Sequence, residues 1–389
     1  MSLARRLAAH QAHAISRRCA GRCFFLLPTA WCRQLIGYCF GLACEKYPFV
    51  ALHALVAMTN HLEVVATDTH SPPGQSQVPR FFGYAHSLIA KAMNHRYGRG
   101  ENFWAPGSYR NLEIHDEPAL LDRLVYALAN PAAADLVETL DDWPGLHFGP
   151  EAWGESVSFD CPEGAFFGGR RERRSSPDLE VARRQREEER RRRAQEEREA
   201  RQADREAGLS KEEARQAAVA RRERRRALEL RSSSRDRSGL APSAKLRFKT
   251  PPTYAERKEE AIREVQAHLR AREAEHRARR EREGKSVLGR EGALAVDPFS
   301  SAGSTEADYS LTPVIACKDP EKRKRVLKCL TGWRRRYREV REQWPKRRNQ
   351  KFPTGTYQMA VLHGAKVMSE EEALQEGLIA EPTGPPGRV

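Results

Sequence analysis

The sequence predicts an α+β fold in its first part, with an antiparallel sheet and helices on one face, followed by a long charged extension. Apolar runs concentrate before Pro150, whereas arginine and glutamate crowd the stretch after Arg170. In the first part, short apolar runs typical of strands alternate with apolar residues at helical spacing. Residues 1–149 are therefore expected to form the folded domain.

The first elements follow from these runs in order. Residues 13–27 are predicted as a strand, and residues 32–47 as an amphipathic helix that Pro48 ends. Residues 49–58 and 62–67 are two apolar runs separated by three residues. That spacing suits two adjacent antiparallel strands.

The next elements complete the domain. Residues 78–97 carry apolar side chains at helical spacing, which predicts a second helix. Residues 102–114 form a strand that Pro106 interrupts, so we expect it at an edge of the sheet or with a bulge. Residues 117–130 return to helix, with Pro118 in the first turn. The order β-α-β-β-α-β-α resembles a ferredoxin-like sandwich plus one terminal helix.

The extension has a different composition. Residues 150–252 form an arginine- and glutamate-rich arm and linker without an apolar stripe, which is expected to be a solvated helix or a disordered arm. A charged helix is predicted for 253–286 and a linker for 287–312. Residues 313–365 are predicted as a basic helical extension, and 366–389 as a disordered tail.

The charge of the chain indicates a polyanionic partner. Its 68 lysines and arginines against 53 acidic residues give a formal net charge of +15. Nucleic acid is favoured over a membrane surface, because the basic segments lack the apolar face of an interfacial helix. No run approaches the roughly 18 apolar residues of a membrane span. The sequence thus predicts a cytoplasmic protein without a membrane partner.

The eight cysteines lack the paired C-x-x-C spacing of a zinc site. We expect them to pack as small buried hydrophobes in a reducing compartment.

Two short segments contain the candidate chemistry. His61 and Glu63 flank Leu62 on a predicted strand, so their side chains point to one face of the sheet. One imidazole with oxygen ligands suits Mg²⁺ or Mn²⁺ better than zinc. The alternative is that His61 ends a turn and Glu63 is solvated.

The second segment places Tyr126 and Asn130 four residues apart, on one face of a helix. A phenol with a pKa of about 10 is a poor nucleophile at neutral pH. A metal held by His61, Glu63 and Asn130 would polarise a phosphodiester and make attack by Tyr126 feasible. The alternative is a tyrosine packed in the core with its hydroxyl hydrogen-bonded.

Together these segments resemble the single-tyrosine HUH transposases, and most closely the REP-associated tyrosine transposases. The strand motif of that family is matched by Met58, Asn60, His61 and Leu62, with Glu63 in place of the usual second histidine. The helix motif is matched by Tyr126, Asn130, Pro131, Ala132, Leu136 and Val137.

The resemblance implies cleavage and rejoining of single-stranded DNA through a 5′-phosphotyrosine intermediate, which is the chemistry of DNA transposition. Tyr126 would be the nucleophile, and the DNA is expected to contain a hairpin. Both a monomer and a homodimer are compatible with the motifs. Because Glu63 adds negative charge beside the phosphate, the alternative is a catalytically degenerate DNA-binding protein that retains the fold.

Several basic residues of the first domain are candidates for phosphate contacts, although each could equally be surface charge. They are Arg17, Arg18, Arg22, Lys91, Arg96, Arg99 and Arg110. Phe103 and Trp104 could stack on bases, but we expect them to fill the core.

Overall fold

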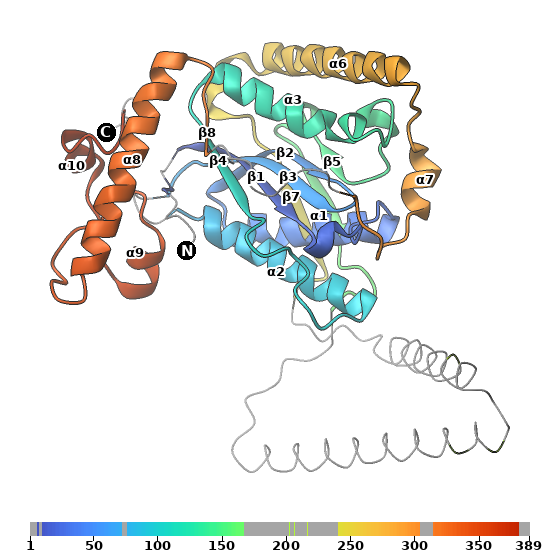
Figure 1. Cartoon of the computed structure of the whole chain (residues 1–389), viewed down its shortest axis with the longest axis horizontal. Coiled ribbons are helices and arrows are strands. Elements are labelled where there is room, and N and C mark those ends of the chain that lie inside the picture. The colour runs from blue at the N-terminus through green and yellow to red at the C-terminus, as the bar shows by residue number, and fades with distance from the viewer. Residues whose placement is uncertain are drawn as a thin grey trace. The chain divides into compact units, whose positions relative to one another are not determined.

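The computed structural model describes residues 6–7, 10–71, 76–166, 240–303 and 314–380, together with 202, 206 and 216. The chain divides into two compact units. The first consists of Met1–Pro162 and Pro242–Val389, and the second of Glu163–Ala241. Most of the second unit, and with it most of the predicted arm, lies outside the described residues. Every helix and strand labelled in Figure 1 belongs to the first unit.

A six-stranded sheet in the order β5-β2-β3-β1-β4-β8 forms the centre of the first unit. The four central strands pair with one another in antiparallel fashion. They are β1 (Ala12–Arg18), β2 (Val50–Ala57), β3 (His61–Asp68) and β4 (Arg110–Ile114). The outer strands are β5 (His147–Phe148), antiparallel to β2, and β8 (Ile315–Ala316), parallel to β4. The α+β class is confirmed, but the sheet is mixed because β8 comes from the C-terminal extension.

Three helices cover the two faces of this sheet. Figure 1 shows α1 (Ala30–Lys46) and α2 (Val78–Tyr97) on one face and α3 (Glu117–Ala133) on the other. The Thr29 hydroxyl caps α1 by accepting from the Cys32 amide, and Gly98 ends α2 in the left-handed conformation, with φ 59°. The elements follow one another along the chain in the predicted order.

Two predicted strands are shorter than expected. The first ends at Arg18 and not at Leu27, because Gly21 and Arg22 turn the chain with φ of 61° and 56°. The fourth begins only at Arg110. The turn at Gly107, with φ 70°, separates it from the segment that starts at Asn102.

The predicted arm at 150–252 has an ordered strand at each end. Strands β6 (Ser156–Asp160) and β7 (Ser243–Arg247) pair antiparallel and pack on α1. A Cβ atom at Gly37 would lie 2.5 Å from the ring of Phe159, so only glycine permits this approach. The two strands alternate in burial, a period-2 pattern that the neighbouring charged run conceals.

The remaining extension is also more ordered than predicted. Helix α7 (Gly289–Ala295) lies in the expected linker, and α10 (Glu370–Gln375) lies in the expected disordered tail. The described part of this tail, up to residue 380, is ordered because Leu378 and Ile379 are buried against α8. Residues 381–389 lie outside the described residues. The other helices of this part are α6 (Lys258–Glu283), α8 (Pro320–Gln343) and α9 (Gln358–His363). No helix in the described part of the chain is both long and apolar enough to cross a membrane.

All eight cysteines are free, and four of them, at positions 19, 32, 39 and 44, are buried. Burial raises the pKa of the Cys32 thiol to about 12. These four side chains therefore act as small hydrophobes, as predicted. The other four are partly exposed.

Candidate active site

Strand β3 presents His61 and Glu63 on the sheet face that carries α3. Arg18 pairs with His61 and Ser16 with Glu63 across the β1–β3 ladder. Leu62 lies between the two and is buried on the opposite face, with 1% of its surface exposed. The alternation of a pleated strand thus sets both polar side chains beneath α3.

Three polar side chains from β3 and α3 converge at this point. The Nε2 atom of His61 lies 3.7 Å from Oε1 of Glu63 and 3.3 Å from Nδ2 of Asn130. A half-turn of the Asn130 amide would place its oxygen at the same position. An imidazole nitrogen, a carboxylate oxygen and an amide therefore meet between the sheet and the helix.

The neighbouring Asn60 fixes the state of the His61 ring. Its Oδ1 atom lies 2.7 Å from Nδ1 of His61 and can only accept, so Nδ1 carries the proton. The lone pair of Nε2 then faces Glu63 and Asn130. Burial, helped by the charge of Arg18, lowers the pKa of His61 to about 4. The ring is consequently neutral at pH 7, the state in which histidine binds metals.

Glu63 is a buried carboxyl, with 9% of its surface exposed. Burial raises the pKa of its carboxyl to about 7, against the opposing effects of a hydrogen bond with Ser16 and the charges of Arg123 and Arg110. Near neutral pH the carboxyl is therefore close to half protonated. A bound cation would favour the carboxylate form.

The cluster fits a hard divalent cation. With 3.7 Å from His61 to Glu63 and 3.3 Å from His61 to Asn130, the three side chains are close enough to contact one bound cation. The donor set of His61, Glu63 and Asn130 suits Mg²⁺ or Mn²⁺. Within the described ranges, no three His, Cys, Asp or Glu side chains form a group that could hold a metal. The amide of Asn130 is therefore essential to a three-residue site here.

Tyr126 lies one helical turn before Asn130 and is 45% exposed, so it is not a core tyrosine. The Arg123 guanidinium stands 4.7 Å from the centre of its ring. Partial burial and the Glu63 carboxylate raise the pKa of the phenol, while Arg123 and Arg110 lower it, and the net direction is upward. The phenol is thus protonated at neutral pH and must lose its proton in order to act as a nucleophile.

Arg123 and Asn60 are site residues that the sequence analysis did not assign. Arg123 forms an ion pair with Asp122 and lies three residues before Tyr126 on the same helical face. This i, i+3 spacing is the sequence feature that could have predicted the contact between Arg123 and Tyr126. Asn60 directly precedes His61, and its position alone does not reveal its contact with the ring.

The predicted phosphate contacts are divided between the two faces of the sheet. Arg18 and Arg110 lie on the face of the candidate site, since Ser16 pairs with both Glu63 and Arg110. Arg17 points to the other face, where its guanidinium lies 6.0 Å from the ring of Trp104. Adjacent residues of a strand cannot share a face, so Arg17 and Arg18 cannot act together there.

The other candidates lie at a turn or on α2. The backbone carbonyl of Arg22 accepts a 3.4 Å hydrogen bond from the side-chain Nδ2 of Asn60. Lys91 and Arg96 are on α2, and Arg99 follows the end of that helix. Helix α2 is on the sheet face opposite α3 (Figure 1), so only Arg18 and Arg110 share a face with His61 and Glu63.

Two aromatic residues near the start of the predicted fourth strand are core residues. Phe103 and Trp104 are exposed by only 2% and 7%. The indole of Trp104 donates to the His86 carbonyl at 2.9 Å. Neither ring is available to stack on a base.

Comparisons with known proteins give a limited likeness among solved structures. No protein-family model and no curated protein matches the chain. Among solved structures, a REP-associated tyrosine transposase bound to a REP hairpin is 20% identical and has a TM-score of 0.32. The match covers 37% of this chain and 81% of that one. A likeness of this size defines neither the family nor the activity of the chain.

Proposed function

We propose that this protein cleaves and rejoins single-stranded DNA through a covalent link between Tyr126 and a 5′-phosphate. The observation that supports this most is the convergence of His61, Glu63 and Asn130, with the exposed Tyr126 one turn away on the same helix. The net charge of +15 suits a polyanionic substrate. The motif resemblance implies that the strand contains a hairpin, and that the reaction serves DNA transposition.

In the proposed reaction, the Tyr126 oxygen attacks the phosphorus and forms a new P–O bond as the bond to the 3′-oxygen breaks. The phenolic proton leaves to solvent, and the departing 3′-oxygen takes up a proton to become a free hydroxyl. A later attack by a 3′-hydroxyl on the phosphotyrosine reverses these steps and joins the strands. Arg123 and Arg110 favour the phenolate, since both lower the pKa of Tyr126.

His61, Glu63 and Asn130 would hold the divalent cation, Mg²⁺ or Mn²⁺. When bound, the cation would offset negative charge on the scissile phosphate. Asn60 keeps the Nε2 lone pair of His61 directed at the cluster. Replacement of His61 by alanine would therefore abolish cleavage while leaving Tyr126 in place.

The decisive experiment is covalent capture of a labelled, hairpin-containing single strand in the presence of Mn²⁺ or Mg²⁺. We expect a denaturant-resistant protein–DNA adduct with the natural sequence and none with Tyr126→Phe, which should still bind the DNA. Tyr109→Phe is the matched control and should form the adduct normally. A complete absence of adduct with either metal contradicts the proposed reaction.

A second candidate is a DNA-binding protein that retains the fold without the activity. It is favoured by Glu63, because the transposase family that the motifs resemble has a histidine at this position. The variant Glu63→His separates the two. If Glu63→His forms the adduct and the natural sequence does not, the natural protein binds DNA without cleaving it. If both form it, Glu63 supports catalysis.

A further inference from the structure

Helix α8 has an exposed basic face opposite its buried face. Of its 24 residues, ten are Lys or Arg and three are Glu. One row of exposed residues, spaced alternately by four and three positions, runs along the helix. This row, called here the basic row, comprises Lys324, Lys328, Thr331, Arg335 and Arg338.

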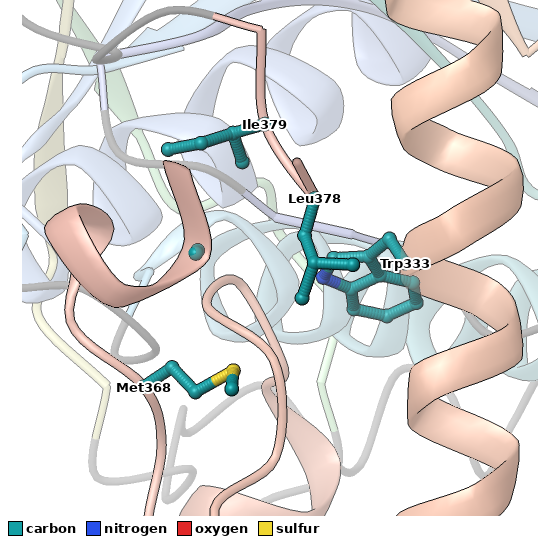
Figure 2. Close-up of a cluster of buried hydrophobic side chains, with 5 residues drawn as sticks. Trp333, Met368, Leu378 and Ile379 are labelled. Atoms are coloured by element: carbon teal, nitrogen blue, oxygen red, sulfur yellow. The ribbon is translucent and has the colours of Figure 1, made fainter. Parts of the chain in front are cut away.

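The opposite side of α8 is occupied by the protein itself. Trp333 is fully buried and packs with Met368, Leu378 and Ile379, as Figure 2 shows. Its indole nitrogen donates to the Thr354 carbonyl at 2.6 Å. These contacts fix the rotation of the helix about its axis and leave the basic row exposed.

The N-terminal end of α8 is attached to the end of α3 nearest to β4. One carboxylate oxygen of Asp116 caps α3 by accepting from the Ala119 amide at 2.9 Å. The other accepts from the Lys318 and Asp319 amides at 2.6 and 3.0 Å. The basic row therefore belongs to an anchored helix and not to a free tail.

The basic row has little internal neutralisation. In the part of the chain that the structure describes, its one ion pair joins Arg335 to Glu339 at 4.0 Å. Lys324, Lys328 and Arg338 are exposed and available to an anionic partner. From Lys324 to Arg338 the helix rises about 21 Å, at 1.5 Å per residue.

Double-stranded DNA is the polyanion that this surface fits. A straight row of cations matches the regular, outward-facing phosphates of a duplex. Proteins that hold single strands add aromatic side chains on which bases stack. The basic row has none, since Trp333 is buried and Tyr337 is stacked on it with ring centres 5.4 Å apart. Insertion into a membrane is disfavoured because the apolar face of α8 is covered.

We propose that the basic row of α8 binds the phosphate backbone of double-stranded DNA. This binding surface is separate from the candidate active site and does not depend on whether Tyr126 is a nucleophile. In the context of the proposed function, α8 would hold a paired stem while β3 and α3 act on an unpaired strand.

The test uses the full chain with Tyr126→Phe, which cannot form the covalent adduct, and a short blunt DNA duplex in a fluorescence anisotropy assay. Lys324, Lys328, Arg335 and Arg338 are all replaced by glutamine. We expect the affinity at low salt to fall by about tenfold or more. The slope of log affinity against log salt should fall by about one for each phosphate that is no longer neutralised.

A matched control removes the same charge elsewhere. Arg263, Arg270, Arg282 and Arg290 are exposed on α6 and α7, and replacing all four by glutamine should change the affinity less than about twofold. A second variant, with Arg335→Lys and Arg338→Lys, keeps the charge and should bind duplex normally. Circular dichroism of each variant should show an unchanged melting temperature, because every substituted residue is exposed.

Several results would overturn the proposal. One is unchanged duplex affinity in the variant with four glutamines, and another is an equal loss in the α6 and α7 control. A third is an equal loss of affinity for single-stranded DNA without hairpins, since this surface should distinguish paired from unpaired strands. Stronger binding of the same surface to anionic phospholipid vesicles than to duplex would also contradict it.

Discussion

Glu113 is a buried carboxylate that connects the sheet to both ends of the described chain. Arg6 donates to it at 2.6 Å, and His115 lies 3.2 Å away. Arg6 also donates to the Leu378 carbonyl at 3.3 Å. Burial acts to raise the pKa of Glu113, but the charge of Arg6 and the hydrogen bonds from Arg6 and His115 outweigh it and hold the pKa at about 2.

This pKa predicts how stability depends on pH. Because the folded pKa lies below its ordinary value of 4.5, Glu113 contributes stability that is present above pH 4.5 and is lost as the pH falls toward 2. Glu113→Gln should lower the free energy of unfolding at pH 7 by up to about 3 kcal/mol, and the difference should narrow below pH 4.5. Urea unfolding of both proteins over this pH range measures it.

The control is Glu101→Gln, which alters an exposed carboxylate 3.5 Å from Arg99. It should change the free energy of unfolding by at most about 1 kcal/mol. A difference between Glu113→Gln and the natural sequence that stays constant with pH would show that the carboxylate is not held ionised by Arg6.

At the scale of elements, α6 clamps the C-terminal end of α3. Arg280 of α6 is almost fully buried, and its Nη1 donates to the Ala132 carbonyl at 3.0 Å. Its Nη2 also pairs with Glu138, and Asp135 lies 3.5 Å from Nη1. The last carbonyls of a helix lack internal partners, so a buried guanidinium stabilises this end. The clamp is two residues beyond Asn130.

Removing this clamp should destabilise the protein. Arg280→Met leaves the Ala132 carbonyl without this donor and removes one of the two arginine partners of each of Asp135 and Glu138. It should cost about 3 kcal/mol in urea unfolding. Arg277→Met is the control, because Arg277 meets Glu138 at 3.3 Å with half of its side chain exposed. Its cost should be below about 1 kcal/mol. Equal costs would mean that Arg280 does not hold the end of α3.

Sequence patterns predicted the elements in which apolar residues repeat at helical or strand spacing over many residues. Helices α1, α2 and α3 and strands β2 and β3 lie close to the expected ranges, since each buries a continuous apolar side. Strand β8 has only two residues and pairs with β4 from far along the chain, so no period could reveal it. The clamp at Arg280 is equally invisible, because a buried arginine in a charged run resembles its exposed neighbours.

The candidate site was predictable to a similar extent. The spacing of His61, Glu63, Tyr126 and Asn130 predicted which side chains share a face, and the structure brings the three candidate ligands together. The alternation of β1 separates Arg17 from the site, although the sequence analysis grouped it with Arg18. The two arginines were grouped by their charge alone, without regard to the face of the strand to which each side chain points.

At the scale of the whole molecule, the C-terminal segment docks through Trp333. Trp333→Ala would leave a cavity among Met368, Leu378 and Ile379 and would remove the hydrogen bond to Thr354. A loss of about 3–5 kcal/mol is expected for such a truncation. We expect limited proteolysis to cut residues 352–380 much faster, while amides of the central sheet keep their protection from hydrogen exchange.

Leu327→Ala is the control for this prediction, since Leu327 is 40% exposed on the same helix. It should leave the proteolysis rate nearly unchanged. If Trp333→Ala exposes the sheet and the C-terminal segment together, the two parts unfold as one cooperative unit and the prediction is wrong.

The pairing of β8 with β4 has a consequence for biosynthesis. As the ribosome releases the chain, β4 is complete long before Ile315 exists, and the outer edge of β4 is left with unpaired backbone groups. The carboxylate of Asp116 likewise lacks one of its donors until the amide of Lys318, 202 positions later, has been synthesised. An unprotected edge of this kind can pair with another nascent chain. Translation that stops before β8 would therefore release aggregation-prone fragments. Only a chain that includes β8 covers the outer edge of β4.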